Sequence, residues 1–471
     1  MRFYDRTEEL GSLNQRWESA QPQLYVLWGR RRVGKTELLA AFLEGKRGFL
    51  YEATTATEAD QLRDLTRVLA EADGHPLLAE QPLTSWEAAL AVIEEYAARG
   101  QAIVALDEFQ YIADATPEIG SLLSRWWREK GRKLPVFLIL SGSEVSFFER
   151  DVLGASAPLY GRRTGQQQLL PFGYRDAGLF FPRYRPEDRI RAFAVCGGMP
   201  YYLEQFEDGK TIGENILRSM LEKDGVLREE GRLLLSQELP DSRVYFSILR
   251  SLAAGANRVG EIANRTGLSA SSVSKALDVL QSLRLVRKLT PVGSSVRGRV
   301  KQTSYELSDG YLRFWFRFVL PYEDRLLTSE SARRHLEFTI MPALDEFVAK
   351  PAFETVAREF LCAAEQAADC GNWWGRVPTG RDRRTEQREV DAVGLDGQGR
   401  LLATGTCKWA GGKMGIAEEE LLRRLDPHVA PPAGEVRHYF FSRGGFDAKL
   451  TALAKSDPDR YVLISPRDLY A

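Results

Sequence analysis

Residues 29–36 read Gly-Arg-Arg-Arg-Val-Gly-Lys-Thr, which is the pattern G-x-x-x-x-G-K-[ST] of a phosphate-binding loop. An apolar run at 24–28 precedes the loop and a helix-like pattern at 37–42 follows it, as the motif requires. The glycines let backbone N–H groups turn toward phosphates, Lys35 would place charge at the β- and γ-phosphates, and Thr36 would offer its hydroxyl to Mg²⁺. We therefore expect a site for ATP and Mg²⁺ formed by Gly29, Arg30, Arg31, Arg32, Val33, Gly34, Lys35, Thr36 and Glu37.

A second motif supplies the carboxylates that such a loop needs. Four apolar residues at 103–106 read as a strand buried on both faces, and they end in Asp107 and Glu108. Asp107 would hold Mg²⁺ through water, and Glu108 would polarise the attacking water as a general base. Acidic pairs at strand ends are common, but behind a phosphate loop this pair indicates a catalytic site.

The first half of the chain alternates apolar runs with amphipathic helical patterns, which predicts a parallel α/β sheet. We expect the run at 136–141 to lie between the two motif strands. Ser141, Gly142 and Ser143 follow at its end, where a hydroxyl would sense the γ-phosphate, and we assign that role to Ser141. An ordinary Ser-Gly-Ser turn is the alternative. The expected strands are 24–28, 48–52, 103–107, 136–141 and 167–170.

Composition sets the broad class of the protein. A length of 471 residues suggests about three domains, and 44% hydrophobic content allows each a core. The first ten residues are charged and no apolar run is long enough to cross a bilayer, so we expect a cytoplasmic protein with no membrane partner. The four cysteines and four histidines show no zinc-site spacing. Because the net charge is −1, any contact with nucleic acid would have to come from local basic patches on the surface.

Residues 244–307 have the pattern of a winged helix. Helical periodicity at 259–266, a Gly-Leu turn and a second helix capped by Ser269 predict a helix-turn-helix, followed by strand candidates at 285–291 and 300–307. The presumed recognition helix lacks Arg or Asn at its start, so sequence-specific base readout is doubtful. Contact with double-stranded DNA and a protein-adaptor role both remain open. The expected wing is basic: Arg284, Arg287, Lys288, Arg297, Arg299 and Lys301.

The chain resembles the archaeal and bacterial AAA+/STAND-like ATPases that carry a winged helix and a restriction-endonuclease-like C-terminal domain. The residues that carry the resemblance are Phe3, Arg6, Glu9 and Leu10, the loop at 29–36, Leu-Asp-Glu-Phe-Gln at 106–110, Pro-Leu-Tyr-Gly-Arg-Arg-Thr-Gly at 158–165 and Gly-Gly-Met-Pro-Tyr-Tyr-Leu at 197–203. The resemblance implies a base pocket near Phe3 and Arg6, and a Gly-x-Pro element whose Pro200 closes over the nucleotide.

Two arginines in the turn at 160–163 are candidates for an arginine finger. The glycine frees the backbone, so Arg162 and Arg163 could project toward a γ-phosphate of the same or another copy. A surface position is the alternative reading. Arg30, Arg31 and Arg32 add positive charge, but side chains at such positions often point to solvent, and we assign them no catalytic role.

The C-terminal region shows a helix, three strands, a helix and a strand, which is the order of the restriction-endonuclease-like core. Asp391 resembles its metal-binding aspartate and Lys408 its lysine, but Thr406 stands where a carboxylate belongs. Glu354, Glu359, Glu386 or Glu389 could replace that charge, although Glu354 and Glu359 fall on different helix faces. Arg376, Arg381, Arg383 and Arg384 could touch phosphates or form a solvated hairpin.

The sequence thus predicts an α/β protein: a P-loop NTPase core at 1–172, a helical lid at 173–238, a winged helix at 239–328 and a nuclease-like domain at 329–471, which the missing carboxylate indicates to be degenerate. We expect an ATP-hydrolysing switch that acts on DNA. An ATP-regulated metal-dependent nuclease and a signalling scaffold that binds a protein partner are the alternatives. Oligomers are compatible with the sequence.

Overall fold

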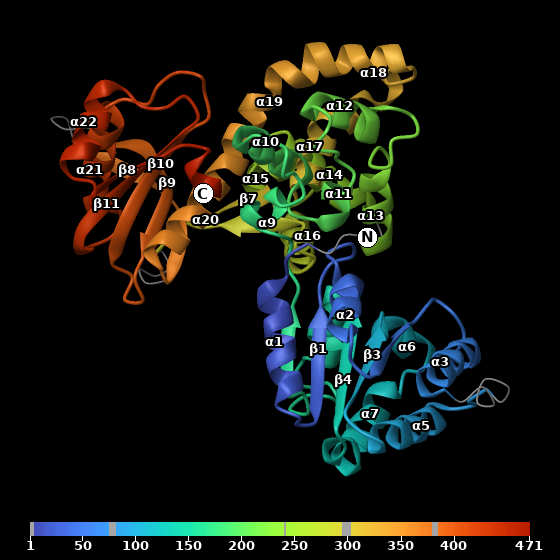
Figure 1. Ribbon diagram of the computed structural model, residues 1–471. Helices are drawn as coiled ribbons and strands as arrows, with labels where there is room; N and C mark the ends of the chain where they lie inside the picture. The colour runs from blue at the N-terminus through green and yellow to red at the C-terminus, as the bar shows by residue number, and fades with distance from the viewer. Residues whose placement is uncertain (1–3, 75–81, 240–241, 294–302, 379–384) are drawn as a thin grey trace. The chain divides into compact units, whose positions relative to one another are not determined.

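The computed structural model describes residues 4–74, 82–239, 242–293, 303–378 and 385–471. The chain divides into two compact units, Met1–Pro171 and Phe172–Ala471 (Figure 1). The expected wing basics Arg297, Arg299 and Lys301, the arginines at 381, 383 and 384, and Phe3 lie outside the described residues.

The first unit contains a five-stranded parallel sheet in the order β2-β3-β4-β1-β5. All residues of β1, β3 and β4 are buried, because helices cover both faces of a parallel sheet. β4 lies between the strands that precede the two motifs, as expected. The strands are β1 (Gln23–Trp28), β2 (Gly48–Glu52), β3 (Ala102–Asp107), β4 (Val136–Gly142) and β5 (Gly165–Gln168).

Aromatic and aliphatic side chains fill both sides of this sheet. On one side Phe137 makes edge-to-face contacts with Tyr25 and Phe42, at centroid distances of 6.0 and 5.4 Å. On the other side Leu65, Trp86 and Leu123 belong to one buried cluster with the strands. The helices are α1 (Thr7–Glu18), α2 (Lys35–Leu43), α3 (Glu58–Asp73), α5 (Trp86–Ala98), α6 (Phe109–Ala115), α7 (Ile119–Glu129), η1 (Gly131–Lys133), α8 (Val145–Phe147) and η2 (Phe148–Val152).

The second unit begins with a helical body that is assembled from two separate stretches of chain. The tilted rings of Tyr202 and Tyr311 have centroids 4.4 Å apart, and Arg313 donates to the carbonyl of Ala194 at 3.2 Å. The first stretch holds α9 (Tyr174–Gly178), α10 (Pro186–Cys196), α11 (Pro200–Leu203), α12 (Ile212–Ile216), η3 (Leu217–Leu221) and α13 (Glu230–Glu238). The second holds α17 (Gly310–Phe314), η5 (Trp315–Val319), η6 (Leu320–Arg325), α18 (Ser329–His335), η7 (Leu336–Ile340), α19 (Met341–Phe347) and η8 (Val348–Phe353).

A winged helix lies between these two stretches, as expected. Its elements are α14 (Ser242–Ala253), α15 (Val259–Thr266), α16 (Ala270–Ser282), β6 (Val286–Leu289) and β7 (Ser304–Leu307), with β6 and β7 antiparallel. Ser269 caps α16 by accepting from the backbone N–H of Ser272 at 3.1 Å.

The chain ends in a mixed sheet in the order β12-β11-β10-β9-β8. β8, β9 and β10 pair antiparallel, and β10, β11 and β12 pair parallel. The order of helix, three strands, helix and strand matches the expectation. The elements are α20 (Glu354–Glu365), β8 (Asp369–Pro378), β9 (Thr385–Leu395), β10 (Leu401–Lys408), α21 (Ala417–Val429), β11 (Pro432–Ser442), α22 (Ala448–Ser456), β12 (Tyr461–Ile464) and η9 (Asp468–Tyr470).

In the part of the chain that the structure describes, every helix is too short or too polar to span a bilayer.

Candidate nucleotide site

The phosphate loop connects β1 to α2 at the carboxyl edge of the parallel sheet. Gly34 adopts φ 91° immediately before α2, a conformation that favours glycine. Lys35 is 4% exposed, and its Nζ donates to the carbonyls of Gly29 at 3.2 Å and Arg30 at 3.3 Å. The ammonium group is therefore held over the loop, where phosphate oxygens can replace the two carbonyls as acceptors.

The two sequence motifs meet in space. The hydroxyl of Thr36 donates to Oδ2 of Asp107 at 2.7 Å, although 71 positions separate the two residues. Asp107 is fully buried at the end of β3. A hydroxyl and a carboxylate at this distance beside a phosphate loop fit the ligand set that Mg²⁺ takes when it also binds phosphate oxygens.

Glu108 follows Asp107 in a left-handed backbone conformation with φ 51°. Its Oε2 accepts hydrogen bonds from Ser143 Oγ at 2.7 Å and from the side-chain amide of Gln110. Ser141 is fully buried and makes no such contact. The hydroxyl that reaches the carboxylate thus belongs to Ser143, two positions beyond the serine that we assigned as the sensor.

Several carboxylates lie close together beside the phosphate loop, and their proximity was not predicted from the sequence. A cleft of about 390 Å³ is lined by loop residues together with Glu52, Thr54, Glu108 and Tyr111. Burial raises the pKa of Glu52, and the charges of Asp107, Glu108 and Glu37 raise it further. A bound divalent cation would relieve this repulsion.

The arginines around the phosphate loop differ in burial and in hydrogen-bond partners. Arg6 is 6% exposed and donates to the carbonyl of Val33 at 2.9 Å, so it supports the loop. Arg31 donates to the hydroxyl of Tyr111 at 2.6 Å. The expectation of solvent-facing loop arginines is wrong for Arg30, which is 5% exposed. Glu37 lies in the first turn of α2, and Pro200 begins α11 in the second unit, so its approach to the nucleotide stays a prediction.

The sequence left open whether Arg162 and Arg163 reach the nucleotide of the same copy or of another copy, and the strand register does not favour the same copy. Arg162 and Arg163 precede β5, whose first residue Gly165 pairs with Tyr25 near the start of β1. The loop follows Trp28 at the opposite end of β1, in register with Gln168. Arg163 and Gln168 are five positions apart, which corresponds to about 16 Å along an extended strand. The pair therefore lies at the amino-terminal edge of the sheet, and only a role toward another copy remains as a proposal.

The C-terminal sheet gathers a second set of charges. Asp391 Oδ2 accepts from the backbone N–H of Cys407 at 2.8 Å and from Thr406 Oγ1 at 3.3 Å. Lys350 Nζ lies 3.0 Å from Glu389 and 3.3 Å from Glu354. An ammonium group of the protein thus neutralises the carboxylates.

The other expected nuclease residues each have a partner of their own. Lys408 donates to the carbonyl of Lys413, Glu359 accepts from the N–H of Tyr174, and Glu386 pairs with Arg388. Among the described residues no three histidine, cysteine or carboxylate side chains are arranged to hold a metal ion. The nuclease alternative stays a prediction.

Comparison with known proteins supports the assignment of the first unit. Residues 3–206 match a family described as an ATPase domain found predominantly in Archaea. The first unit has the fold of a P-loop NTPase, and its sequence is similar to this ATPase domain. Residues 245–290 match the helix-turn-helix domain of the IclR type, and residues 315–420 match a family of archaeal and bacterial proteins of unknown function.

Two other proteins and one solved structure are similar to this chain. The chain is 27% identical over 414 residues to an uncharacterized protein of Methanocaldococcus jannaschii, covering 86% of this chain and 87% of that protein. Over 45 residues it is 49% identical to an uncharacterized ATP-binding protein of the same organism, covering 10% of this chain and 76% of that one. The solved Walker-type ATPase of Pyrococcus abyssi superposes with a TM-score of 0.50 at 21% identity, covering 67% of this chain and 96% of that chain, which shows a shared fold.

Proposed function

We propose that the protein is an ATP-hydrolysing switch that couples nucleotide state in the first unit to the winged helix and the C-terminal sheet, and that it acts on DNA. The hydrogen bond between Thr36 and Asp107 carries this proposal, because it joins the two halves of a nucleotide site from distant parts of the sequence. The match of residues 3–206 to an ATPase domain supports it.

In the proposed reaction, the loop N–H groups and Lys35 bind and orient the phosphates. Thr36 and Asp107 would hold Mg²⁺. A bound Mg²⁺ ion would neutralise the negative charge that develops on the γ-phosphate. Glu108 orients and polarises the attacking water, while the hydroxyl of Ser143 keeps the Glu108 carboxylate in position.

The DNA part of the proposal depends on the winged helix. Residues 245–290 match a helix-turn-helix domain, and Ser271 and Ser272 of α16 are exposed, where they could meet a nucleic-acid backbone. A protein partner on the same helix remains the alternative, since Val279 of α16 is 38% exposed.

Replacement of Glu108 tests the hydrolytic mechanism. We expect Glu108→Gln to bind ATP as the wild type does and to lower the rate of phosphate release by about 10²- to 10⁴-fold, because the amide cannot accept the proton. Exposed Glu129→Gln on α7 is the matched control and should retain the wild-type rate. Wild-type turnover by Glu108→Gln would contradict the assignment.

A further inference from the structure

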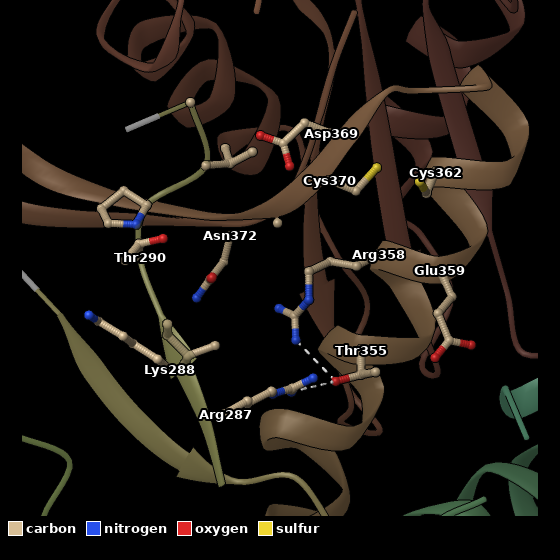
Figure 2. Close-up of a pocket in the computed structure, with 15 residues that line it drawn as sticks. Arg287, Lys288, Thr290, Thr355, Arg358, Glu359, Cys362, Asp369, Cys370 and Asn372 are labelled. Atoms are coloured by element: carbon tan, nitrogen blue, oxygen red, sulfur yellow. Dashed lines mark hydrogen bonds between the residues drawn. The ribbon is translucent and has the colours of Figure 1, made fainter. Parts of the chain in front are cut away.

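A second cavity lies entirely within the second unit. It has a volume of about 580 Å³ and lies between β6 with the residues that follow it, α20 and the start of β8 (Figure 2). Its lining includes Arg287, Lys288, Thr355, Arg358, Asp369 and Asn372. None of them belongs to the phosphate loop or to its acidic partners.

The walls of this cavity are fixed to one another. The backbone N–H of Val292, beyond β6, donates to the carbonyl of Asn372 in β8 at 3.0 Å. The side chain of Val292 is 8% exposed and belongs to the same buried cluster as Trp373 and Val390. The stretch after β6 is therefore anchored in the core of the C-terminal sheet, and the cavity between them is preformed.

Two guanidinium groups from different elements converge in this cavity. Arg287 of β6 and Arg358 of α20 both donate through Nη2 to Thr355 Oγ1, at 3.2 and 3.0 Å. Figure 2 shows the two side chains pointing toward each other at this hydroxyl. Like charges held this close repel, and an anion between them would stabilise the arrangement.

The remaining contacts of the two arginines fix their orientation. Arg287 also pairs with Glu306 across the β6–β7 hairpin. Arg358 donates to the carbonyl of Asp391 at 3.0 Å and lies 3.7 Å from Glu354. Guanidinium groups that are positioned in advance lose little entropy when they bind a planar or tetrahedral anion.

Three other lining residues set the charge balance. The side chain of Lys288 is exposed and makes no hydrogen bond or ion pair within the described part of the chain. Glu359 accepts through its carboxylate from the N–H of Tyr174. Burial raises the pKa of Glu359. Asp369 is an exposed acid of the lining, so three cationic side chains and two carboxyl groups line the cavity.

We infer that this cavity binds the phosphate group of a nucleotide unit, either free or within a nucleic-acid strand. The paired guanidinium groups and Lys288 would hold the phosphate, and the amide of Asn372 offers a polar contact for the rest of the nucleotide. The volume is within the range of small-ligand sites. The inference goes beyond the proposed ATPase, because the two sites share no residue.

The test uses the full-length chain with Lys35→Ala, so that the phosphate loop does not contribute. The probe is a 5′-phosphorylated decathymidylate with a 3′-fluorescein, followed by fluorescence anisotropy over a salt series. Lys288→Gln should weaken binding roughly three- to tenfold and lower the salt slope by about 1. Asp369→Asn should tighten binding, and Lys449→Gln on the exposed face of α22 should change nothing. Affinity unchanged by both Lys288→Gln and Asp369→Asn would overturn the inference.

A second readout locates the ligand and identifies its source. Cys362 lines the cavity and is partly exposed, so a bound nucleotide should slow its alkylation by N-ethylmaleimide, measured by peptide mass spectrometry. Protection by AMP indicates a free nucleotide, and protection by the oligonucleotide alone indicates a strand. Equal protection by inorganic phosphate at the same concentration would overturn the nucleotide assignment. Absence of protection by any of the three would overturn the site. None of these outcomes depends on ATP hydrolysis.

Discussion

Glu108 has a backbone conformation that few residues other than glycine adopt. A left-handed conformation at such a residue costs on the order of 1–3 kcal/mol and persists where the surroundings impose it. Here the strained residue is the one whose carboxylate Ser143 and Gln110 hold beside the phosphate loop. The local strain therefore coincides with the position that we propose for the general base.

The buried carboxylate of Glu354 predicts a pH dependence of stability. Burial raises the pKa of Glu354 to about 7, with Asp391 and Glu389 raising it and Lys350 and Arg358 lowering it. Since the folded pKa exceeds the unfolded one, the folded state binds more protons between about pH 4.5 and 7, and stability falls as the pH rises through this window. Glu354→Gln should reduce that decline, measured as the unfolding temperature against pH by calorimetry.

A surface replacement provides the comparison. Glu337→Gln, at an exposed position, should leave the profile of unfolding temperature against pH unchanged. An identical profile for Glu354→Gln and the wild type would show that another group causes the decline. Asp391, whose pKa burial also raises, is then the next residue to replace.

The proximity of Thr36 and Asp107 could be predicted, because two motifs fix their positions. Lys35, Thr36 and Asp107 could be named from sequence because a phosphate loop and a strand-end acid have few alternative arrangements. Glu52 and Ser143 could not be assigned in the same way, since their proximity to Glu108 arises from the order of strands in the sheet. The sequence showed the Ser-Gly-Ser turn, but it did not show which of the two hydroxyl groups contacts the carboxylate of Glu108.

At the scale of elements, the phosphate loop depends on a close backbone contact. A Cβ atom on Gly29 would lie 2.4 Å from the carbonyl oxygen of Leu169, which follows β5. That oxygen is a backbone atom and cannot rotate away. We expect Gly29→Ala to displace the start of the loop and to weaken ATP binding by at least about tenfold, measured by titration calorimetry.

The control for this change is another glycine in the same unit. Gly11 lies in α1, and a Cβ atom there would have no neighbouring atom within 4 Å. Gly11→Ala should therefore stabilise the helix by up to about 1 kcal/mol and leave ATP binding unchanged. Normal ATP affinity in Gly29→Ala would show that the loop tolerates the displacement.

Elements defined by local periodicity could be predicted, and elements defined by distant contacts could not. The strands β1 to β4 are apolar runs bounded by polar residues, and they lie within a few residues of their expected limits. The return of α17 and the helices after it onto α10 was not predicted. Its contacts, such as Arg191 with Asp345 at 3.0 Å, join residues 154 positions apart.

At the scale of the whole molecule, the proposal requires nucleic acid to affect ATP hydrolysis. We expect double-stranded DNA to stimulate phosphate release at low salt and to lose this effect as salt rises, because phosphate contacts release counterions. The measurement is the steady-state ATPase rate with and without DNA over a salt series. A rate that DNA leaves unchanged at every salt concentration would favour a protein partner for the winged helix.

The most direct test of the account is the binding of ATP with Mg²⁺ to the wild type and to Lys35→Ala, measured by isothermal titration calorimetry, with exposed Lys130→Ala as the control. We predict one strong site in the wild type and in the control, and at least about 100-fold weaker binding in Lys35→Ala, since the loop then lacks its charge at the phosphates. Wild-type affinity in Lys35→Ala would contradict the central claim that the phosphate loop is the ATP site.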